Sequence, residues 1–400
     1  MRILASLVCL SLCAFSQTIL VQPDDLAASL KDPALVLLHV GAQKDYDSGH
    51  IPGARLVTLS DLSVIGEKGL RMEMPPVDTL RATLLKLGVG DASRVVIYTG
   101  NDSIQSATRV FFTFDYLSLK AALLDGGLSL WKSKGLPIET QASRFSAATK
   151  LTVRPRPELI ADAAYTSAHL NDNSISIVDA RLPEFYNGTN AGGMPRAGHI
   201  PNASNLPYLS FVDESKKVLP VGSLKQKLGT RPVLAYCHLG MQATVVYFAA
   251  RLAGLDAKLY DGSFEDWSAR SELAVSTEVK DTKKYHVIFE MSAGEQPRLE
   301  AIVRNIDNIK IALGAENVAV ELVLHGAAIF SYTKDKSGPL ATDWERLAKS
   351  GVGLLACNNS LKMRNIPQDS LLPYVKVVDS AVAELVRKQQ AGWQYIRNAN

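Results

Sequence analysis

Apolar residues along this chain follow two alternating patterns. Short runs such as 36–40, 94–99 and 232–237 are mostly apolar, which is typical of strands buried on both faces of a parallel sheet. Longer stretches, such as 243–252 before Gly254, carry apolar residues at the spacing of a helix face. Strands that alternate with helices in this way predict an α/β fold built on parallel sheets.

Four sequence blocks occur twice and in the same order, which predicts two homologous domains. The matched pairs are 36–40 with 177–181, 48–54 with 197–203, 94–99 with 232–237, and 124–131 with 260–267. The stretch 143–157, with its scattered Arg and Pro residues, predicts the linker between the two copies.

A third unit follows residue 283 and repeats none of these blocks. Its strand patterns lie at 285–289, 317–324 and 352–356, and its helix patterns lie at 296–313, 344–349 and 380–390. This alternation again predicts a parallel-sheet α/β domain, smaller than the other two. A chain of 400 residues is too long for one ordinary core, and we expect domains at 17–145, 152–275 and 283–398.

The first residues predict a secretory signal peptide at 1–16. Arg2 precedes an apolar run at 3–15 that is too short to span a membrane, and cleavage is expected near Gln17. The alternatives are a retained membrane anchor and lipidation of Cys13. The signal peptide predicts export to a bacterial periplasm or secretion. No later stretch reaches spanning length without charges, so we expect no stable membrane span.

Composition narrows the classes of function. The chain is 47% hydrophobic and 21% charged, which is typical of a globular protein. The net charge of +3 is small and no basic cluster occurs, so we expect no nucleic-acid partner. No Cys or His pair has zinc-like spacing, and we predict no metal and no other cofactor.

Cys237 is the strongest candidate for chemistry because of its place in the pattern. It ends the strand pattern 232–237, and the helix pattern 243–252 begins six residues later. The free N–H groups and dipole of a helix start favour an anion, and the thiolate is the nucleophilic form of cysteine. The chain has four cysteines, of which Cys9 and Cys13 lie in the leader, so a disulfide framework is not expected. The alternative is a buried, inert thiol.

Around Cys237 the chain resembles a tandem-domain rhodanese, a sulfurtransferase, over about 20–275. The matching motifs are Asp-Ala-Arg at 179–181, Gly-His-Ile-Pro at 198–201, the cysteine loop at 237–242, and Asp-Gly-Ser-x-x-x-Trp at 261–267. In this family the second copy carries the active cysteine. The resemblance therefore implies that Cys237 is catalytic and that the first copy, with Thr99 at the matching place, is inactive.

Residues 283–398 resemble the DsrE/DsrF-like family of small sulfur-handling proteins. The resemblance rests on 323–326, on 356–360 around Cys357, and on 392–396. It implies that Cys357 accepts sulfur from Cys237, and that the domain assembles into a homo-oligomer. The alternative for Cys357 is a buried thiol at the end of a strand.

Sulfur transfer follows from the resemblance and fits the residues. The Cys237 thiolate attacks the outer sulfur of thiosulfate or a similar anionic donor, sulfite leaves, and a persulfide forms that a thiol or cyanide then takes up. The N–H groups of the loop stabilise the anion, and Gly240 lets the backbone curl around the sulfur. Arg181 would hold the anionic group of the sulfur donor, or would instead pair with Asp179 or Glu184. The expected binding residues are Arg181, His238, Leu239, Gly240, Met241 and Gln242.

The cysteine loop departs from the family patterns, so several functions stay open. Thiosulfate enzymes of the family tend to carry basic residues after the cysteine, and mercaptopyruvate enzymes carry Cys-Gly-Ser-Gly, whereas here His238 and Leu239 follow. Thiosulfate is our first choice of sulfur donor and mercaptopyruvate the second. A cysteine phosphatase would need an Arg where Ala243 stands. A non-enzymatic persulfide carrier is the second class of function.

Five other residues are expected to be structural or peripheral. His50 and His199 occur in both copies, including the one without a cysteine, so we expect structural hydrogen bonds for them. Trp131 and Trp267 are paired in the same way and are expected in the core. Arg196 is a second candidate for the anionic group of the donor, after Arg181, but is expected to be a solvated loop residue. His238 would either lower the pKa of the thiol or point into solvent.

Overall fold

The computed structural model describes residues 18–100, 103–278, 283–315 and 317–397, and the expected signal peptide at 1–16 lies outside them. The chain divides near residue 280 into two compact units, of which the first contains both sequence repeats and the second contains the third predicted domain. No helix of the described residues is both long enough and apolar enough to cross a membrane.

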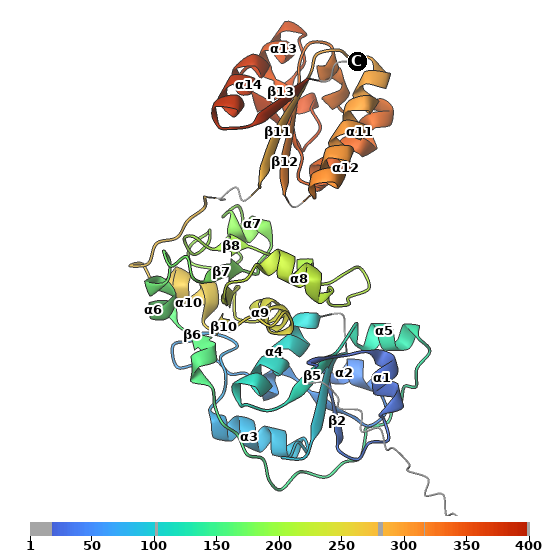
Figure 1. Cartoon of the computed structure of the whole chain (residues 1–400), viewed down its shortest axis with the longest axis vertical. Coiled ribbons are helices and arrows are strands. Elements are labelled where there is room, and N and C mark those ends of the chain that lie inside the picture. Colours follow the sequence, from blue (N-terminus) through green and yellow to red (C-terminus); the bar gives the residue numbers. More distant parts are fainter. Residues whose placement is uncertain (1–17, 101–102, 279–282, 316, 398–400) are drawn as a thin grey trace, which may run out of the picture. The chain divides into compact units, whose positions relative to one another are not determined.

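The two repeats fold into two parallel sheets with the same strand order (Figure 1). The sheets run β1-β5-β4-β2-β3 and β6-β10-β9-β7-β8. The first repeat comprises β1 (Leu20–Val21), α1 (Pro23–Ala28), β2 (Leu35–Val40), α2 (Gln43–Asp47), β3 (Ala54–Val57), α3 (Val77–Lys86), β4 (Arg94–Thr99), α4 (Ile104–Tyr116), β5 (Ala121–Leu124) and α5 (Gly127–Ser133). The second comprises β6 (Ile160–Ala161), α6 (Ala163–Ala168), β7 (Ser176–Asp179), α7 (Pro183–Tyr186), β8 (Ser204–Asn205), α8 (Val221–Leu228), β9 (Val233–Tyr236), α9 (Ala243–Leu252), β10 (Ala257–Tyr260) and α10 (Ser263–Ala269).

Register confirms that the repeats are equivalent. In the first sheet His39 of β2 pairs with Tyr98 of β4, and in the second Asp179 of β7 pairs with Tyr236 of β9. The central strands β4 and β9 are buried, as their apolar runs predict. The predicted parallel α/β fold is therefore confirmed.

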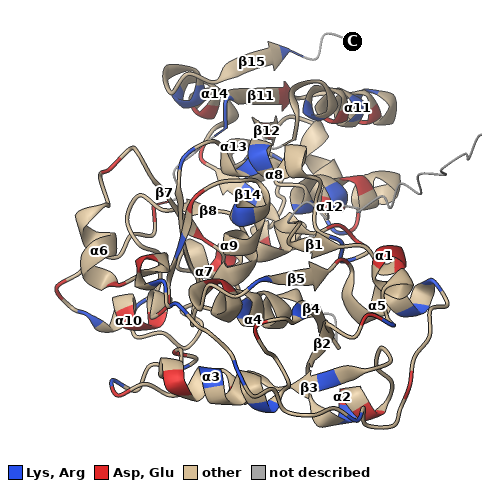
Figure 2. Cartoon of the chain, turned by 60° about the horizontal axis from the view of Figure 1, so that its bottom comes forward, with Lys and Arg blue, Asp and Glu red and all other residues tan. Residues whose placement is uncertain are grey.

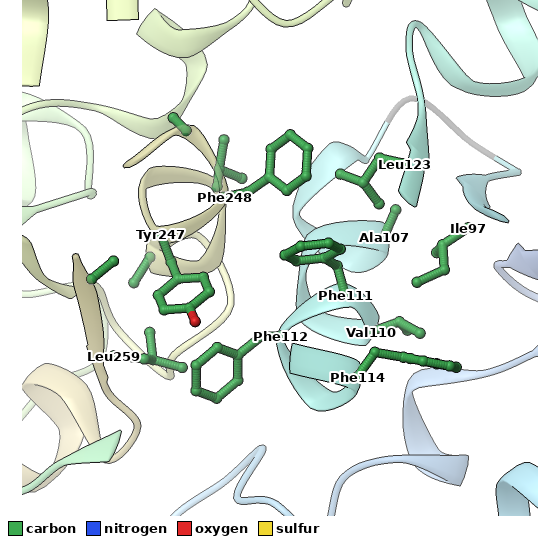
Figure 3. Close-up of a cluster of buried hydrophobic side chains, with 14 of the residues drawn as sticks. Ile97, Ala107, Val110, Phe111, Phe112, Phe114, Leu123, Tyr247, Phe248 and Leu259 are labelled. Atoms are coloured by element: carbon green, nitrogen blue, oxygen red, sulfur yellow. The ribbon is translucent and has the colours of Figure 1, made fainter. Parts of the chain in front are cut away.

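The two repeats meet through α4 and α9, which lie side by side (Figure 1). Figure 3 shows aromatic rings filling the space between these helices. Phe111 packs edge-on against Phe248, and Phe112 packs edge-on against Tyr247, each with ring centroids 4.9 Å apart. The helix that follows the cysteine loop therefore rests on a helix of the first repeat.

The second unit is a separate five-stranded parallel sheet with the order β14-β13-β12-β11-β15. Its elements are β11 (Tyr285–Met291), α11 (Gln296–Leu313), β12 (Val318–Leu324), α12 (Ala341–Lys349), β13 (Gly353–Cys357), α13 (Asn358–Met363), β14 (Val375–Val378), α14 (Ala381–Gln390) and β15 (Gln394–Arg397). Basic and acidic residues are interspersed along helices such as α3, α11 and α12 (Figure 2).

Candidate active site

Cys237 directly follows β9, and the loop 238–242 connects it to α9. The residue is 1% exposed. Its N–H donates to Ser263 Oγ at 3.2 Å, and its carbonyl accepts from the Phe264 N–H at 3.0 Å. The His238 carbonyl accepts from the Glu265 N–H, also at 3.0 Å. The turn that begins α10 therefore fixes the start of the cysteine loop.

Ser263 is a site residue that the sequence did not reveal. It is fully buried, its Oγ donates to the Tyr260 carbonyl at 2.8 Å, and its φ is +52°. A left-handed backbone costs a residue with a side chain roughly 1–2 kcal/mol. The first repeat has Gly127 at this place, with a φ of +55°. The Gly-to-Ser difference between the matched blocks 124–131 and 260–267 is a signal that could have revealed it.

Gly240 shapes the loop, as its predicted role requires. Its φ is +79°, and a Cβ placed there would lie 2.8 Å from the Asp261 carbonyl oxygen and 3.0 Å from Asp261 Oδ1. Only glycine allows both this conformation and this close approach. The loop and the turn at Asp261 are therefore packed backbone against backbone.

The other loop residues present mainly their backbone. Leu239 packs against the core of the second repeat, and the Met241 carbonyl accepts from Thr244 Oγ1 at 2.6 Å. Gln242 precedes α9, and its Oε1 is buried without a protein partner. Among the described residues, the N–H groups of 238–242 donate to no protein acceptor. Five consecutive N–H groups beside Cys237 are thus available to an anion.

Arg181 is placed in a buried ion pair, which is the alternative that the sequence left open. The residue is 1% exposed, and its guanidinium bonds both carboxylate oxygens of Asp179 at 2.6–3.1 Å and the Gly198 carbonyl at 2.7 Å. It also lies over the Phe264 ring at 4.1 Å.

The Arg181 charge nevertheless acts near the thiol. Burial lowers the pKa of Arg181, but the attraction of Asp179 outweighs it, and Cys237 is among the groups that raise the pKa further. Arg181 therefore stays protonated, and its positive charge contributes to the electrostatic field at Cys237. Its guanidinium is at the same time hydrogen-bonded to the Asp179 carboxylate. Binding of the sulfur donor by Arg181 stays a prediction.

His238 does not point into solvent, contrary to one of its two expected placements. Its ring meets Phe185 edge-on with centroids 4.6 Å apart, and its Nε2 is buried without a protein partner. Burial, and then the charge of Arg181, lowers the pKa of His238. The ring is therefore neutral at neutral pH and adds no full positive charge at the thiol.

Arg71 is an exposed cation beside the loop that the linear sequence did not indicate. It lies in a hairpin of the first repeat, closed by the antiparallel bridge between Val64 and Glu73. Its Nε donates to Glu265 Oε1 at 2.7 Å and its N–H to Glu265 Oε2 at 2.9 Å, while its side chain is 53% exposed. Its charge is among those that lower the pKa of His238. The first repeat therefore brings a positive charge to the cysteine loop of the second.

The equivalent place in the first repeat carries none of the three site residues described above. Thr99 occupies the position of Cys237, His39 that of Asp179, and Gly41 that of Arg181. His39 is fully buried with its Nδ1 3.1 Å from the Tyr98 hydroxyl, and burial lowers the pKa of His39 to about 4. At this place the first repeat therefore has neither a thiol nor the Asp–Arg pair of the second.

The other paired residues are structural. His50 Nδ1 bonds the Tyr46 carbonyl at 2.8 Å, and His199 Nδ1 bonds the Tyr186 carbonyl at 2.7 Å. Trp131 and Trp267 are fully buried, as expected. The expectation for Arg196 was wrong, because its guanidinium is half-buried and donates to four main-chain carbonyls. These belong to Trp267, Ser268, Arg270 and Leu273.

In the second unit, Cys357 ends β13 and is 4% exposed. Its Sγ accepts a hydrogen bond from the Ala381 N–H at 3.3 Å. Burial raises the pKa of Cys357, but hydrogen bonds from Ala381, Ser360 and Asn359 together hold it below the ordinary 9.0. Ser360 is held in turn by the Gly326 N–H at 3.0 Å. The site therefore favours a thiolate.

This placement predicts the pH dependence of alkylation at Cys357. Because the hydrogen bonds favour the thiolate, its rate with iodoacetamide reaches half of the maximum below pH 9.0. The variant Ser360→Ala removes one of these bonds and moves the midpoint upward. Peptide mass spectrometry over a pH series assigns the modified cysteine. An unchanged midpoint in Ser360→Ala contradicts the role of that hydroxyl.

No group of three or more His, Cys, Asp or Glu side chains in the described parts of the chain could hold a metal ion. Both described cysteines, Cys237 and Cys357, are free thiols.

Two like sheets, of which only the second is followed by a cysteine loop, make the first unit a tandem pair of α/β domains. Family comparison agrees: residues 22–134 and 162–270 match the rhodanese-like domain, and residues 283–397 match the DsrE/DsrF-like family. The chain belongs to the rhodanese-like family and carries a DsrE/DsrF-like domain after its two rhodanese-like domains.

Curated relatives support this assignment. A probable 3-mercaptopyruvate sulfurtransferase of Pseudomonas aeruginosa is 31% identical over 280 residues, covering 64% of this chain and 98% of the relative. The mitochondrial thiosulfate/3-mercaptopyruvate sulfurtransferase 1 of Arabidopsis thaliana is 27% identical over 296 residues, covering 64% and 78%. The crystal structure of YnjE matches with a TM-score of 0.58 at 23% identity, over 64% and 68% of the two chains, and supports the fold alone. The relatives confirm an enzyme of the sulfurtransferase class.

Proposed function

We propose that the chain moves sulfane sulfur from a small anionic donor to a thiophilic acceptor through a persulfide on Cys237. The observation that carries the proposal is the run of five N–H groups at 238–242, beside the buried thiol, that donate to no acceptor in the described parts of the chain. Such a run of N–H groups suits the negative charge of a thiolate and of a persulfide.

The reaction has two steps. In the first, the Cys237 thiolate attacks the outer sulfur of thiosulfate, an S–S bond forms, and the S–S bond of the donor breaks so that sulfite leaves with the electron pair. In the second, cyanide or a thiolate attacks the outer sulfur of the persulfide, and Cys237 leaves as a thiolate. The enzyme returns to its starting state without an oxidant or a reductant.

Thiosulfate is the first sulfur donor proposed, and 3-mercaptopyruvate is the second candidate. The names of the relatives support both candidates, since the Pseudomonas aeruginosa relative is named for 3-mercaptopyruvate and the Arabidopsis thaliana relative for thiosulfate and 3-mercaptopyruvate. The test compares turnover of each donor with cyanide and with a small thiol, together with the mass of the protein after donor alone. A gain of one sulfur atom on the Cys237 peptide supports the proposal, and turnover without that gain overturns the persulfide.

Arg71 offers a prediction about affinity for the sulfur donor. Because Arg71 is half-exposed near His238, Arg71→Ala is expected to raise KM for an anionic donor about fivefold, as the loss of roughly 1 kcal/mol requires, with kcat unchanged. Arg81→Ala is the matched control, since Arg81 is 48% exposed in the same repeat and, among the described residues, forms an ion pair only with Asp78. Equal shifts in both variants, or none in Arg71→Ala, contradict this role.

The thiolate-favouring site at Cys357 supports a second step, in which Cys357 takes the sulfur from the Cys237 persulfide. Fusion in one chain raises the effective concentration of the second thiol. The test loads the protein with one equivalent of donor and follows sulfur on the two cysteine peptides over time. Sulfur that never reaches Cys357 argues for a catalytic domain beside an independent one.

We also propose that the protein is exported and that it forms a homo-oligomer. Export is supported by Arg2 and the apolar run at 3–15, and fractionation of expressing cells tests it. Homo-oligomerisation through the C-terminal domain is tested by the mass of the full chain in solution. A non-enzymatic carrier is the alternative function, and it predicts a stable Cys237 persulfide without turnover.

A further inference from the structure

Arg109 belongs to the inactive repeat, yet its guanidinium lies at the cysteine loop of the other. It is carried by α4 and is only 2% exposed. Its Nη1 donates to Asp261 Oδ1 and, at 3.4 Å, to the Gly240 carbonyl, and its Nη2 donates to the Met72 carbonyl. One side chain thus joins the cysteine loop, the turn before α10 and the hairpin of the first repeat.

The buried positive charge of Arg109 restricts how far the groups bonded to it can move. A buried guanidinium must be paired, and Asp261 is the only carboxylate that bonds Arg109 in the described structure. Its Nε is buried without a protein partner, so all of its hydrogen bonds run through the two terminal nitrogens toward the loop, the turn and the hairpin. A shift of the loop would leave this charge short of partners.

The groups that Arg109 holds are those that fix Cys237. Gly240, three residues after the thiol, packs against Asp261, which is bonded to Arg109. Ser263, two residues after Asp261, accepts the Cys237 N–H. We propose that Arg109 is a positioning residue, through which the repeat without a cysteine holds the Cys237 loop in its anion-binding form.

The proposal rests on the function proposed for Cys237, and it goes beyond a general role in holding the repeats together. The α4–α9 contact has its own supports, which are the two aromatic pairs and the Thr108–Thr244 hydrogen bond at 2.7 Å. A second ion pair crosses the same contact between Asp115 of α4 and Arg251 of α9, at 3.1 Å. Arg251 therefore serves as a matched control.

The experiment compares Arg109→Gln, Arg109→Lys and the control Arg251→Gln in the full chain. The first readout is the pH profile of Cys237 alkylation by iodoacetamide, with Cys357 in the same molecule as an internal reference. The second is kcat and KM with thiosulfate and with 3-mercaptopyruvate. Urea unfolding shows whether each variant is folded at assay conditions.

We expect Arg109→Gln to displace the Cys237 profile and to lower kcat by about 10²-fold, the effect of a misplacement near 1 Å, with a smaller change in KM. Arg109→Lys keeps the charge and is expected to recover part of the alkylation profile and part of kcat. Arg251→Gln is expected to leave the alkylation profile and kcat as in the wild type. An unchanged Cys237 profile in folded Arg109→Gln, or an equal change in Arg251→Gln, overturns the proposal. Because alkylation needs no sulfur donor, it tests Arg109 even if neither donor is turned over.

Discussion

Replacing Cys237 with serine lowers sulfurtransferase turnover by at least about 10³-fold, because the hydroxyl cannot take up sulfur as a persulfide. The substitution exchanges the sulfur of a buried side chain for a smaller oxygen and adds no bulk, so the fold is retained. The measurement is initial turnover with each of the two proposed donors, alongside the mass of the protein after donor alone. Neither turnover nor added sulfur on the 237 peptide is expected.

Cys357→Ser is the control for this prediction, since Cys357 is a buried free thiol of the separate unit. Turnover with small acceptors is expected to persist in it. If Cys237→Ser kept its activity while Cys357→Ser lost it, the chemistry would belong to the DsrE/DsrF-like domain. If the wild-type protein formed the Cys237 persulfide but did not turn over, the carrier would be the better description.

The repeat without a cysteine has a physical reason to remain. It contributes α4, against which α9 packs, and from the same helix it extends Arg109 to the loop. It also contributes the hairpin that carries Arg71 to Glu265. Thr99, His39 and Gly41 concern only the place that matches the Cys237 site, so the absence of a thiol there is compatible with a supporting role for the repeat.

The sequence predicted those parts of the fold that depend on local pattern. The helices at 243–252 and 296–313 begin and end where apolar spacing and glycine placed them. Strands β14 and β15 were not predicted from the sequence. They lie at the edges of the sheet, where residues are exposed or half-exposed, so they lack the continuous apolar run that marks a buried strand. Cys237 itself could be predicted as a site residue because it lies between a strand pattern and a helix pattern that are close together in the sequence.

The partners of the site could not be predicted in the same way, because they come from distant sequence. Arg109 and Gly240 are 131 residues apart, and Arg71 and Glu265 are 194 residues apart. Nothing in a single sequence states that such residues meet. The choice between donor binding and an ion pair for Arg181 depends on burial, which the pattern of Asp-Ala-Arg does not reveal.

Gly240→Ala is expected to lower kcat by about 10²-fold while the chain stays folded. The added methyl group would meet the Asp261 carbonyl at 2.8 Å and Asp261 Oδ1 at 3.0 Å, so the cysteine loop must move away from the turn that holds it. Gly254→Ala separates this contact from backbone strain, since Gly254 has the same φ of +79° and open space around it. Strain is expected to cost each variant roughly 1 kcal/mol of stability in urea, the contact with Asp261 adds to the loss in Gly240→Ala, and only Gly240→Ala is expected to lose turnover. If Gly254→Ala lost turnover equally, strain alone would account for the effect, and the packed contact between loop and turn would have no role in positioning the thiol.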